Sequence, residues 1–400
     1  MMWLSAQLGS REHYSVPSAL HSAGLLGFLL TDVWLSRRLA ALASGIHPAL
    51  AHRRCDDVPD VKVRSRTLSR LLFDAKMRLK LVGPWETILL RNSWFGGWVA
   101  DEVAALPGNV FFSYSYTALQ PFQSFNGRRI LGQIDPGPRE HDIVAEAAKG
   151  YESLAQPESR PPSSYWQLWR GEVELADRII VNSAWSASLL EEAGVPVGKM
   201  VEVPLVYEPG WDSSHSSSGD HLVTRIWSPV TSAPSRLRAL FLGSVILRKG
   251  VGQLLDAIRI IRNEPVDFTF AGPVGVNIPD DVRAMPNVRF LGAVDRATAE
   301  QLYGESDVFL FPTLSDGFGL TQLEALGHGL PVIASTNCGQ VVEHGVSGLV
   351  LGMVTPEAIA EAIMSLMRDQ DLLARLKAGA RVPDKFHPRH LAPALLALAS

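Results

Sequence analysis

The sequence predicts an α/β protein built from two doubly wound domains. Short runs rich in β-branched and aromatic residues alternate with helical patterns along both halves of the chain, which is typical of parallel sheets covered by helices. A length of 400 residues with 46% hydrophobic content suits two globular domains of ordinary size. The segment 208–236, rich in Ser, Pro and Gly, has no sustained period and predicts a linker. We therefore expect an N-terminal domain over 1–207 and a C-terminal domain over 237–385.

The predicted strands of the N-terminal half are short apolar runs, and helical patterns fill most of the gaps between them. These strands span Met2–Ala6, Leu25–Thr31, Glu86–Arg91, Val110–Ser113, Arg129–Gln133, Arg178–Asn182 and Met200–Pro204. The helical pattern after the first strand ends before Gly24, a favourable residue for the left-handed position that follows a helix.

The C-terminal half shows the same alternation without repeating the sequence. Its predicted strands span Leu237–Leu242, Asp267–Ala271, Val288–Leu291, Val308–Phe311, Pro331–Ala334 and Gly348–Leu351. Its predicted helices span Val251–Arg262, Ala297–Ser306, Leu320–Gly327 and Pro356–Met367. A last helix, His390–Ala399, is largely apolar and therefore needs a surface to cover.

The composition argues against several classes of protein. A net charge of −4 gives no sign of a nucleic-acid partner, and Cys55 and Cys338 are too few for a disulfide framework. No apolar run reaches the roughly 18 residues that a membrane span needs, and the first residues lack the parts of a signal peptide. We therefore expect a cytoplasmic protein.

The segment from Ser315 to Ala325 carries the strongest functional signal. It follows an apolar strand, pairs two glycines in a turn and opens directly into a helix, with Asp316 and Glu324 on either side. Glycines let backbone N–H groups approach a ligand, and a helix N-terminus favours a phosphate. The two carboxylates can accept hydrogen bonds from sugar hydroxyls. This combination predicts a nucleotide-sugar site.

The run DGFGLTQLEALGHGLPVI resembles the E-x7-E motif of the family 4 glycosyltransferases of GT-B fold, with Asp316 in place of the first Glu. Downstream residues match the tail of that motif: Gly339, Glu343, Gly345, Gly348 and Leu349. The resemblance implies a GT-B fold, in which two Rossmann-like doubly wound domains face each other across a cleft. It also implies a nucleoside-diphosphate sugar as donor, transfer with retention of configuration, and no metal ion or other cofactor.

Further segments of the C-terminal half resemble the donor site of this family. Gly243 and Ser244 end a strand, and Arg248 and Lys249 precede a helix, as in the family's FVGRLxxxKG segment. Cations there stabilise the negative charge that builds up on the leaving diphosphate. The alternative is a solvated basic pair at a helix start. The resemblance places the other donor contacts at Gly292, Ala293, Val294, Gly317, Phe318, Gly319, Leu320, Thr321 and Glu324.

The N-terminal half carries the residues expected near the transferred sugar and the acceptor. Gly9 and Ser10 match the family's first loop, which faces the phosphates and the sugar, and His13 follows on the acceptor side. Gln133 and Asp135 stand where many family members end a strand in a histidine. Gln cannot serve as a base, whereas Asp135 can orient an acceptor or take a proton. The alternative is a turn selected only for stiffness.

Two segments raise the question of partner surfaces. Residues 66–81 mix leucines with Lys and Arg, which is typical of a basic amphipathic helix on anionic lipid, or of a helix that covers the sheet and keeps a solvated basic face. By the resemblance, the helix in 386–400 crosses back to the N-terminal domain. The alternative is that it seals the C-terminal domain or a dimer contact.

The resulting hypothesis is a retaining, metal-independent hexosyltransferase that uses a saccharide or lipid-linked acceptor in polysaccharide or glycolipid synthesis. Its catalytic candidates are Lys249, Arg248, Asp316 and Asp135. A nucleotide-sugar epimerase or a glycoside phosphorylase could share this fold, because fold does not fix function. From a different class, the chain could be a non-catalytic nucleotide-sugar-binding partner in a polysaccharide assembly complex.

Overall fold

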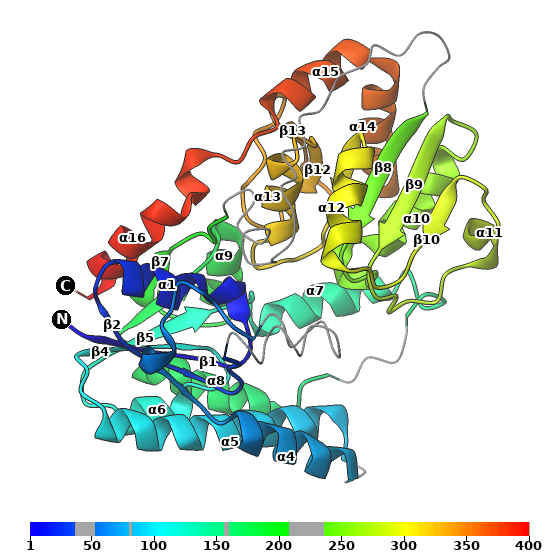
Figure 1. Cartoon of the computed structure of the whole chain (residues 1–400). Helices are drawn as coiled ribbons and strands as arrows, with labels where there is room; N and C mark the ends of the chain where they lie inside the picture. Colours follow the sequence, from blue (N-terminus) through cyan, green and yellow to red (C-terminus); the bar gives the residue numbers. More distant parts are fainter. Residues whose placement is uncertain (37–52, 80–81, 156–159, 208–235, 400) are drawn as a thin grey trace. The chain divides into compact units, whose positions relative to one another are not determined.

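The computed structural model describes residues 1–36, 53–79, 82–155, 160–207 and 236–399 (Figure 1). The chain divides into two compact units. Unit 1 comprises Met1–Pro138, Ser159–Val206 and Lys385–Ser400, and unit 2 comprises Arg139–Glu158 and Tyr207–Asp384.

The sheet of unit 1 is parallel throughout, with the strand order β3-β2-β1-β4-β5-β6-β7. This is a doubly wound order in which the direction of winding reverses between the neighbours β1 and β4. The strands are β1 (Trp3–Gln7), β2 (Leu26–Thr31), β3 (Val63–Ser65), β4 (Val110–Tyr114), β5 (Arg128–Gln133), β6 (Arg178–Val181) and β7 (Met200–Glu202).

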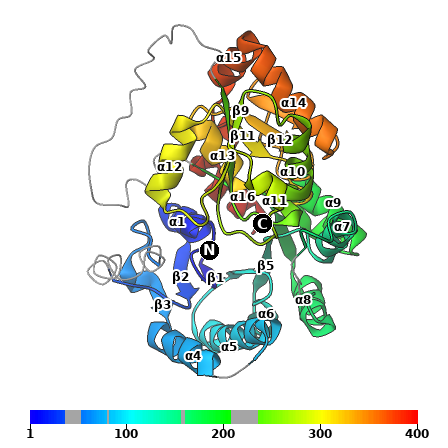
Figure 2. The same cartoon turned by 90° about the vertical axis from the view of Figure 1, so that its right-hand side faces the viewer.

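Helices cover both faces of this sheet. They include η1 (Arg11–Tyr14), α1 (Ser15–Ser22), α4 (Thr67–Leu79), α5 (Pro84–Ala105), α6 (Leu119–Ser124), α8 (Ser163–Leu175), α9 (Ala184–Glu192) and α16 (Leu391–Leu398). Neighbouring strand residues point to opposite faces. Leu4 and Phe111 therefore pack with α5, α6 and α8, whereas Trp3 and Phe112 pack with α1 and α16. Figure 2 shows α4, α5 and α6 together along one side of unit 1.

Helix α1 ends as the sequence predicts. Gly24 adopts φ +72°, its N–H donates to the carbonyl of His21 at 2.9 Å, and the N–H of Leu25 donates to Leu20 at 2.8 Å. This pair of bonds satisfies carbonyls at the helix end that would otherwise lack partners. The left-handed turn returns the chain into β2.

Unit 2 repeats the architecture with a second parallel sheet of order β10-β9-β8-β11-β12-β13, which reverses between β8 and β11. Its strands are β8 (Leu237–Leu242), β9 (Val266–Ala271), β10 (Val288–Phe290), β11 (Val308–Phe311), β12 (Val332–Ser335) and β13 (Gly348–Leu351). Its helices are α7 (Pro138–Ala148), α10 (Val251–Ile260), α11 (Asp280–Arg283), α12 (Arg296–Glu305), α13 (Leu320–Gly327), α14 (Pro356–Arg368) and α15 (Gln370–Gly379).

One predicted strand is wrong. Residues Glu86–Arg91 lie inside the long helix α5, which starts with Pro84 in its first turn. A short apolar run has the same pattern in a buried strand and in one turn of a helix, and a proline suits the first helical position. The strand β3 was not predicted. The other predicted strands are present, with ends that shift by two residues or fewer.

Each half of the chain contributes one segment to the unit that the other half mainly forms. Residues 139–155, which we expected in the N-terminal domain, belong to unit 2. Tyr151 explains this placement, because its ring packs where Gly252 has no side chain and its hydroxyl donates to Asp256 at 3.0 Å. Helix α16 belongs to unit 1 and packs against α1. The linker expected over 208–236 lies, except for residue 236, outside the described residues.

We expect Leu395→Ala to lower the free energy of unfolding by about 2 to 4 kcal/mol, because it removes a fully buried side chain from the α1 face of unit 1. Leu396 is the matched control on the same helix, since it is 41% exposed and its replacement by Ala should cost less than about 0.5 kcal/mol. Chemical denaturation of both variants measures the difference. Equal effects would contradict the role assigned to α16.

Candidate functional site

The candidate donor site lies at the carboxyl ends of β8 and β11 in unit 2. Ligands of doubly wound sheets bind outside the strand ends where the order reverses, and β8 and β11 are the neighbours at that point. Gly243 and Ser244 follow β8, and the loop from Thr313 to Asp316 follows β11. The structure therefore brings together two segments that the sequence separates by about seventy residues.

Backbone contacts hold these two loops against each other. The carbonyl of Arg248 accepts from the N–H of Leu314 at 2.9 Å and from the Thr313 hydroxyl at 3.1 Å. Gly250 adopts φ +71° at the start of α10, and a Cβ there would lie 1.8 Å from the carbonyl oxygen of Pro312. Only glycine permits both this conformation and this approach.

Four charged side chains converge where the loops meet. Lys249 donates to Asp316, and its ammonium group lies 4.8 Å from the centre of the Phe311 ring. The guanidinium of Arg248 lies 3.7 Å from Asp316 and 3.3 Å from Glu140, and it donates to the carbonyl of Ser315 at 2.9 Å. Both cations expected to contact phosphate thus also bind the carboxylate of the glycine turn.

Asp316 is fixed as an anion in this cluster. Burial opposes ionisation of its carboxyl group, but the charges of Lys249 and Arg248 outweigh that effect and lower its pKa. Its other oxygen accepts from the N–H of Phe318 at 3.3 Å, inside the turn before α13. Asp316 therefore positions the turn and the cations together.

Glu324 lies on α13 with both carboxylate oxygens engaged. The Tyr303 hydroxyl donates to one oxygen at 2.9 Å and Arg296 to the other at 3.2 Å, and Glu324 is only 8% exposed. Burial raises the pKa of Tyr303 far above its usual value, and the charge of Glu324 adds to that shift. The side chains on α12 therefore hold the carboxylate in one orientation.

The remaining donor candidates form the turn and the neighbouring strand ends. Gly317, Phe318, Gly319, Leu320 and Thr321 form the turn and the first residues of α13, where Phe318 is buried and its carbonyl accepts from Gly339 at 3.0 Å.

Gly292, Ala293 and Val294 follow β10, at the edge of the same sheet. The carbonyl of Gly292 accepts from the N–H of Gly272 at 2.7 Å, which links this loop to the end of β9.

In unit 1, the loop after β1 carries the predicted residues Gly9, Ser10 and His13. The N–H of Gly9 donates to Asp32 at 2.9 Å, and His13 is exposed. Glu12, His13 and Tyr14 adopt φ values of +47°, +51° and +63°, which the sequence analysis did not predict. Such conformations are costly for residues with side chains, so the surrounding packing must impose them.

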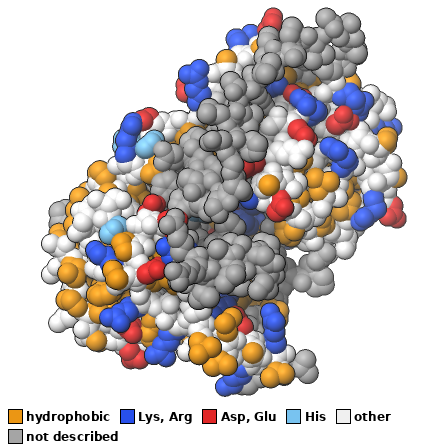
Figure 3. Space-filling model, in the orientation of Figure 1, with side chains coloured by type: hydrophobic (Ala, Val, Ile, Leu, Met, Phe, Trp, Pro, Cys, Tyr) orange, Lys and Arg blue, Asp and Glu red, His pale blue; other side chains and the backbone are white. Residues whose placement is uncertain are grey.

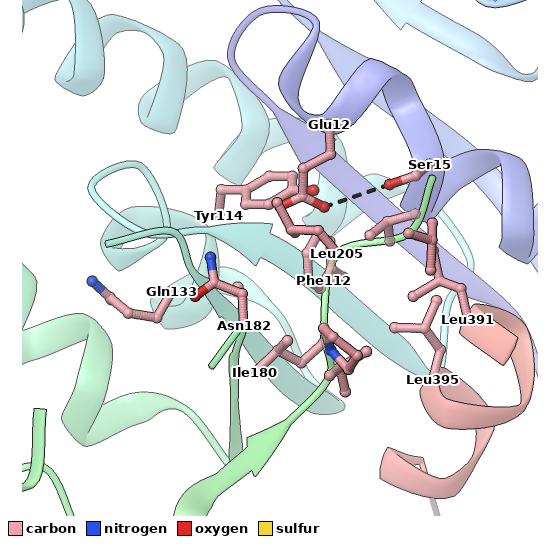
Figure 4. A pocket seen from close by; sticks show the side chains of 15 residues that line it. Glu12, Ser15, Phe112, Tyr114, Gln133, Ile180, Asn182, Leu205, Leu391 and Leu395 are labelled. Atoms are coloured by element: carbon pink, nitrogen blue, oxygen red, sulfur yellow. Dashed lines mark hydrogen bonds between the residues drawn. The ribbon is translucent and has the colours of Figure 1, made fainter. Parts of the chain in front are cut away.

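The strained loop turns Glu12 into the protein. Burial raises the pKa of its carboxyl group, which faces the Tyr114 hydroxyl and lies 3.5 Å from Ser15 Oγ (Figure 4). The adjoining cavity, which Leu391 and Leu395 help to line, has a volume of about 20 Å³. That volume holds about one water molecule, which is too small for a sugar.

Gln133 and Asp135 form a fixed pair at the end of β5. The Gln133 carbonyl accepts from the Trp169 indole at 3.0 Å, and its amide donates to Asp135 at 3.1 Å. Asp135 also accepts from the Tyr116 hydroxyl at 2.7 Å and from the N–H of Gly137 at 2.9 Å. Gln133 thus orients Asp135, which is a role that the sequence did not indicate.

Glu172 is a buried carboxyl group that sequence reasoning missed. From α8 it accepts three backbone N–H bonds in the segment after β4, from Tyr116 at 2.7 Å, Ala118 at 2.8 Å and Leu119 at 3.3 Å. Burial raises its pKa to about 8. Its spacing of three residues from the buried Trp169 was the available signal, since both lie on one face of the helix.

Two further observations concern metal ligands and membrane-spanning helices. Among the described residues, no three His, Cys, Asp or Glu side chains are grouped as metal ligands would be. No described helix has the length and apolar character needed to cross a membrane.

Comparisons with known proteins show which sequences this chain resembles. Residues 236–369, which include both loops of the candidate donor site, match the family described as Glycosyl transferases group 1. A D-inositol 3-phosphate glycosyltransferase of Corynebacterium jeikeium is 27% identical over 266 residues, which cover 62% of each chain. The chain spans 35% to 62% of the length of the first curated relatives.

Solved structures match nearly the whole chain. HepE of Anabaena, in complex with UDP and glucose, matches with a TM-score of 0.62 and 13% identity over 99% of this chain and 98% of its own. The catalytic domain of Starch Synthase IV of Arabidopsis thaliana, bound to ADP and acarbose, gives 0.67 and 11% over 100% and 98%. The two parallel-sheet units therefore have the fold of GT-B glycosyltransferases.

The raised pKa of Glu172 predicts a pH-dependent stability. The folded protein binds this proton more tightly than the unfolded chain, so protonated Glu172 favours folding at low pH, and that contribution is lost as the pH rises from about 4.5 to about 8. Glu172→Gln cannot titrate. We therefore expect the unfolding free energy of the wild type to fall relative to the variant across this window. Urea denaturation at both ends tests it, and a constant difference would contradict the prediction.

Proposed function

We propose that this protein is a glycosyltransferase that moves a hexose from a nucleoside-diphosphate sugar to a saccharide or lipid-linked acceptor. The observation that carries the proposal is the cluster of Lys249, Arg248 and Asp316 at the point where the strand order of unit 2 reverses. This cluster lies beside the glycine turn that starts α13 and within the matched family segment. Cations, turn amides and a helix N-terminus together suit a diphosphate.

In this proposal, the reaction depends on charge that develops on the leaving group. Breaking the glycosidic bond adds negative charge to the diphosphate, and Lys249 and Arg248 stabilise it. Asp316 positions these cations before the donor binds. After the donor binds, Asp316 is the candidate to accept a hydrogen bond from a sugar hydroxyl. Glu324, held by Tyr303 and Arg296, is the corresponding candidate for a ribose hydroxyl.

The finer assignments rest on the family resemblance. We propose a retaining reaction of the family 4 type, without a metal ion or other cofactor, in polysaccharide or glycolipid synthesis. Gly9 and Ser10 would meet the phosphates and the sugar, and Asp135 would orient the acceptor hydroxyl. A cytoplasmic location fits Cys55 and Cys338, which are buried free thiols.

Release of nucleoside diphosphate tests the proposal. The purified chain is mixed with UDP-, GDP- or ADP-hexoses, with and without saccharide acceptors, and the released diphosphate is measured. Release that increases with an acceptor supports transfer. Interconversion of the donor sugars without release would instead indicate an epimerase, and dependence on inorganic phosphate would indicate a phosphorylase. Donor binding without turnover would indicate a non-catalytic partner.

We expect Lys249→Ala and Glu324→Gln each to reduce kcat/KM for the donor at least about tenfold, because each removes a charged contact. Lys149→Ala is the matched control in unit 2, since Lys149 makes an exposed pair with Glu146. Steady-state diphosphate release gives the rates, and thermal melts show whether each variant folds. Wild-type rates in both folded variants would refute the site.

We further propose that α4 rests on an anionic membrane surface, where a lipid-linked acceptor would be available. Four leucines of α4 point into solvent: Leu68, Leu71, Leu72 and Leu79 are 71%, 54%, 64% and 87% exposed. Lys76 and Arg78 lie among them, and hydrophobic and basic side chains adjoin at the lower edge of Figure 3. Exposed leucines beside cations suit insertion among acidic headgroups.

Replacing Leu72 and Leu79 with Ser should abolish sedimentation with vesicles of phosphatidylglycerol, because it removes apolar area that would enter the lipid. Leu168→Ser is the control, since Leu168 is 45% exposed on α8. Neutral phosphatidylcholine vesicles should bind the wild type weakly. Unchanged binding of the double variant, or no binding of the wild type to acidic vesicles, would exclude this surface.

A further inference from the structure

Unit 1 contains a second pocket, distinct from the small cavity beside Glu12, with a volume of about 160 Å³. Arg11 lies in its wall after β1, Ser115 and Tyr116 follow β4, and Trp85, Arg91 and Tyr165 complete it from α5 and α8. All of these elements belong to unit 1.

The position of this pocket is the one that a doubly wound sheet uses for ligands. The strand order of unit 1 reverses between β1 and β4, and the pocket walls come from the loops that follow these two strands. Crevices at this point bind ligands in open α/β sheets. Glu172 and the left-handed conformation of Tyr116, at φ +74°, hold the loop after β4 in shape.

Polar groups in the pocket wall lack partners within the described residues. Ser115 is 2% exposed, and its hydroxyl makes no hydrogen bond there. The buried Nε of Arg91 also makes none. Buried polar groups are almost always paired, because an unpaired one costs free energy. Two such groups in one pocket wall therefore point to a ligand that accepts hydrogen bonds.

The charges around the pocket favour an anion. Arg11 and Arg91 form no ion pair with any carboxylate of the described residues, whereas nearby Arg70 is neutralised by Asp32 at 2.7 Å and Asp74 at 3.0 Å. Burial and the charge of Arg70 lower the pKa of Arg91, because both disfavour its charged form. The nearby acidic side chains offset this positive charge only in part. Glu12 and Glu172 have raised pKa values, and Asp135 already accepts three hydrogen bonds.

Aromatic rings form another wall of the pocket. Tyr116 and Tyr165 stack with centroids 4.6 Å apart and planes inclined by 19°, and Trp85 meets Tyr165 edge-on at 5.1 Å. The bond from the Tyr116 hydroxyl to Asp135 fixes the stack and connects the pocket to the candidate acceptor-side carboxylate. Flat aromatic faces pack well against the C–H face of a sugar or cyclitol ring.

We propose that this pocket binds the acceptor, and that the acceptor is a polyhydroxylated ring carrying a phosphate or carboxylate group. Arg11 and Arg91 bind the oxyanion, Ser115 donates to it or to a ring hydroxyl, and the aromatic wall supports the ring. The assignment of an acceptor rests on the proposed glycosyl transfer. The volume is large enough for one ring with its anionic substituent.

Calorimetric titration of the full chain without donor tests the proposal independently of transfer. The anionic probes are glucose 6-phosphate, D-inositol 3-phosphate and glucuronate, and the neutral probes are glucose and myo-inositol. At least one anionic probe should bind about tenfold or more tightly than its neutral counterpart, because charge-assisted hydrogen bonds are the strong ones. Inorganic phosphate should bind more weakly than the phosphorylated ring, because it leaves the aromatic wall unused.

Variants assign the binding to this pocket. Arg91→Gln and Arg11→Gln should each weaken the anionic probe about tenfold or more, and Ser115→Ala should weaken it less. Lys149→Gln changes the net charge equally but removes only an exposed ion pair with Glu146 in unit 2, so it should bind like the wild type. UDP binding should be unaffected in all four, which checks their folding. Arg11→Gln decides the question if Arg91→Gln does not fold.

Several results would overturn the inference. They are the failure of every anionic probe to bind, equal affinity for neutral and anionic rings, equal affinity for free phosphate, and undiminished binding by folded Arg91→Gln and Arg11→Gln. If the anionic ring binds as expected but no donor is turned over, the pocket stands as a binding site and the proposed transfer fails. If transfer occurs to neutral acceptors alone, the inference fails and the proposed function stands.

Discussion

The close approach of Gly250 to the carbonyl of Pro312 is the constraint on which the candidate donor site depends. Any side chain at position 250 would overlap that oxygen, so the loop after β8 can meet the loop after β11 only through glycine. The backbone bonds of Arg248 to Leu314 and Thr313 then fix the register between the loops. With that register set, Lys249 and Asp316 meet without further adjustment.

In unit 1, a buried carboxyl group instead of a glycine holds the loop at the point where the strand order reverses. Glu172 accepts three backbone N–H groups and so holds the segment after β4, from which Ser115 and Tyr116 reach the pocket. The strand order reverses in the same way in both units, but the units differ in how they hold the loops at the reversal point. The backbone contact at Gly250 admits only glycine, whereas a buried carboxyl group introduces a proton whose affinity depends on the fold.

Much of the fold could be predicted from the sequence, because buried parallel strands are continuous apolar runs. The strands of unit 2 follow this rule closely, and Gly24 and Gly319 mark helix boundaries by their conformational freedom. The prediction of a strand at Glu86–Arg91 was wrong, because a short apolar run in a long helix has the same local pattern as a buried strand. The composition of residues 139–155 could not show that Tyr151 packs on Gly252, since that contact depends on tertiary structure.

The candidate site divides in the same way. Local motifs predicted Lys249, Asp316 and Glu324 as site residues, and the structure adds which partners each one has. Glu172 and Ser115 carry no local motif, because their importance comes from burial and from neighbours distant in the chain. The pairing of Gln133 with Trp169 likewise required the assembled sheet and helix. The hydrogen-bond partners in a buried network depend on the tertiary structure, so a single segment of sequence does not determine them.

The return of α16 to unit 1 has a consequence for synthesis of the protein. The apolar layer that contains Trp3 and Tyr14 also needs Leu391, Leu395 and Leu398, which the ribosome adds after all of unit 2. The first unit to emerge is therefore the last to complete its core. Until α16 docks, that layer remains exposed to solvent, and nascent chains with such surfaces are the ones that chaperones bind.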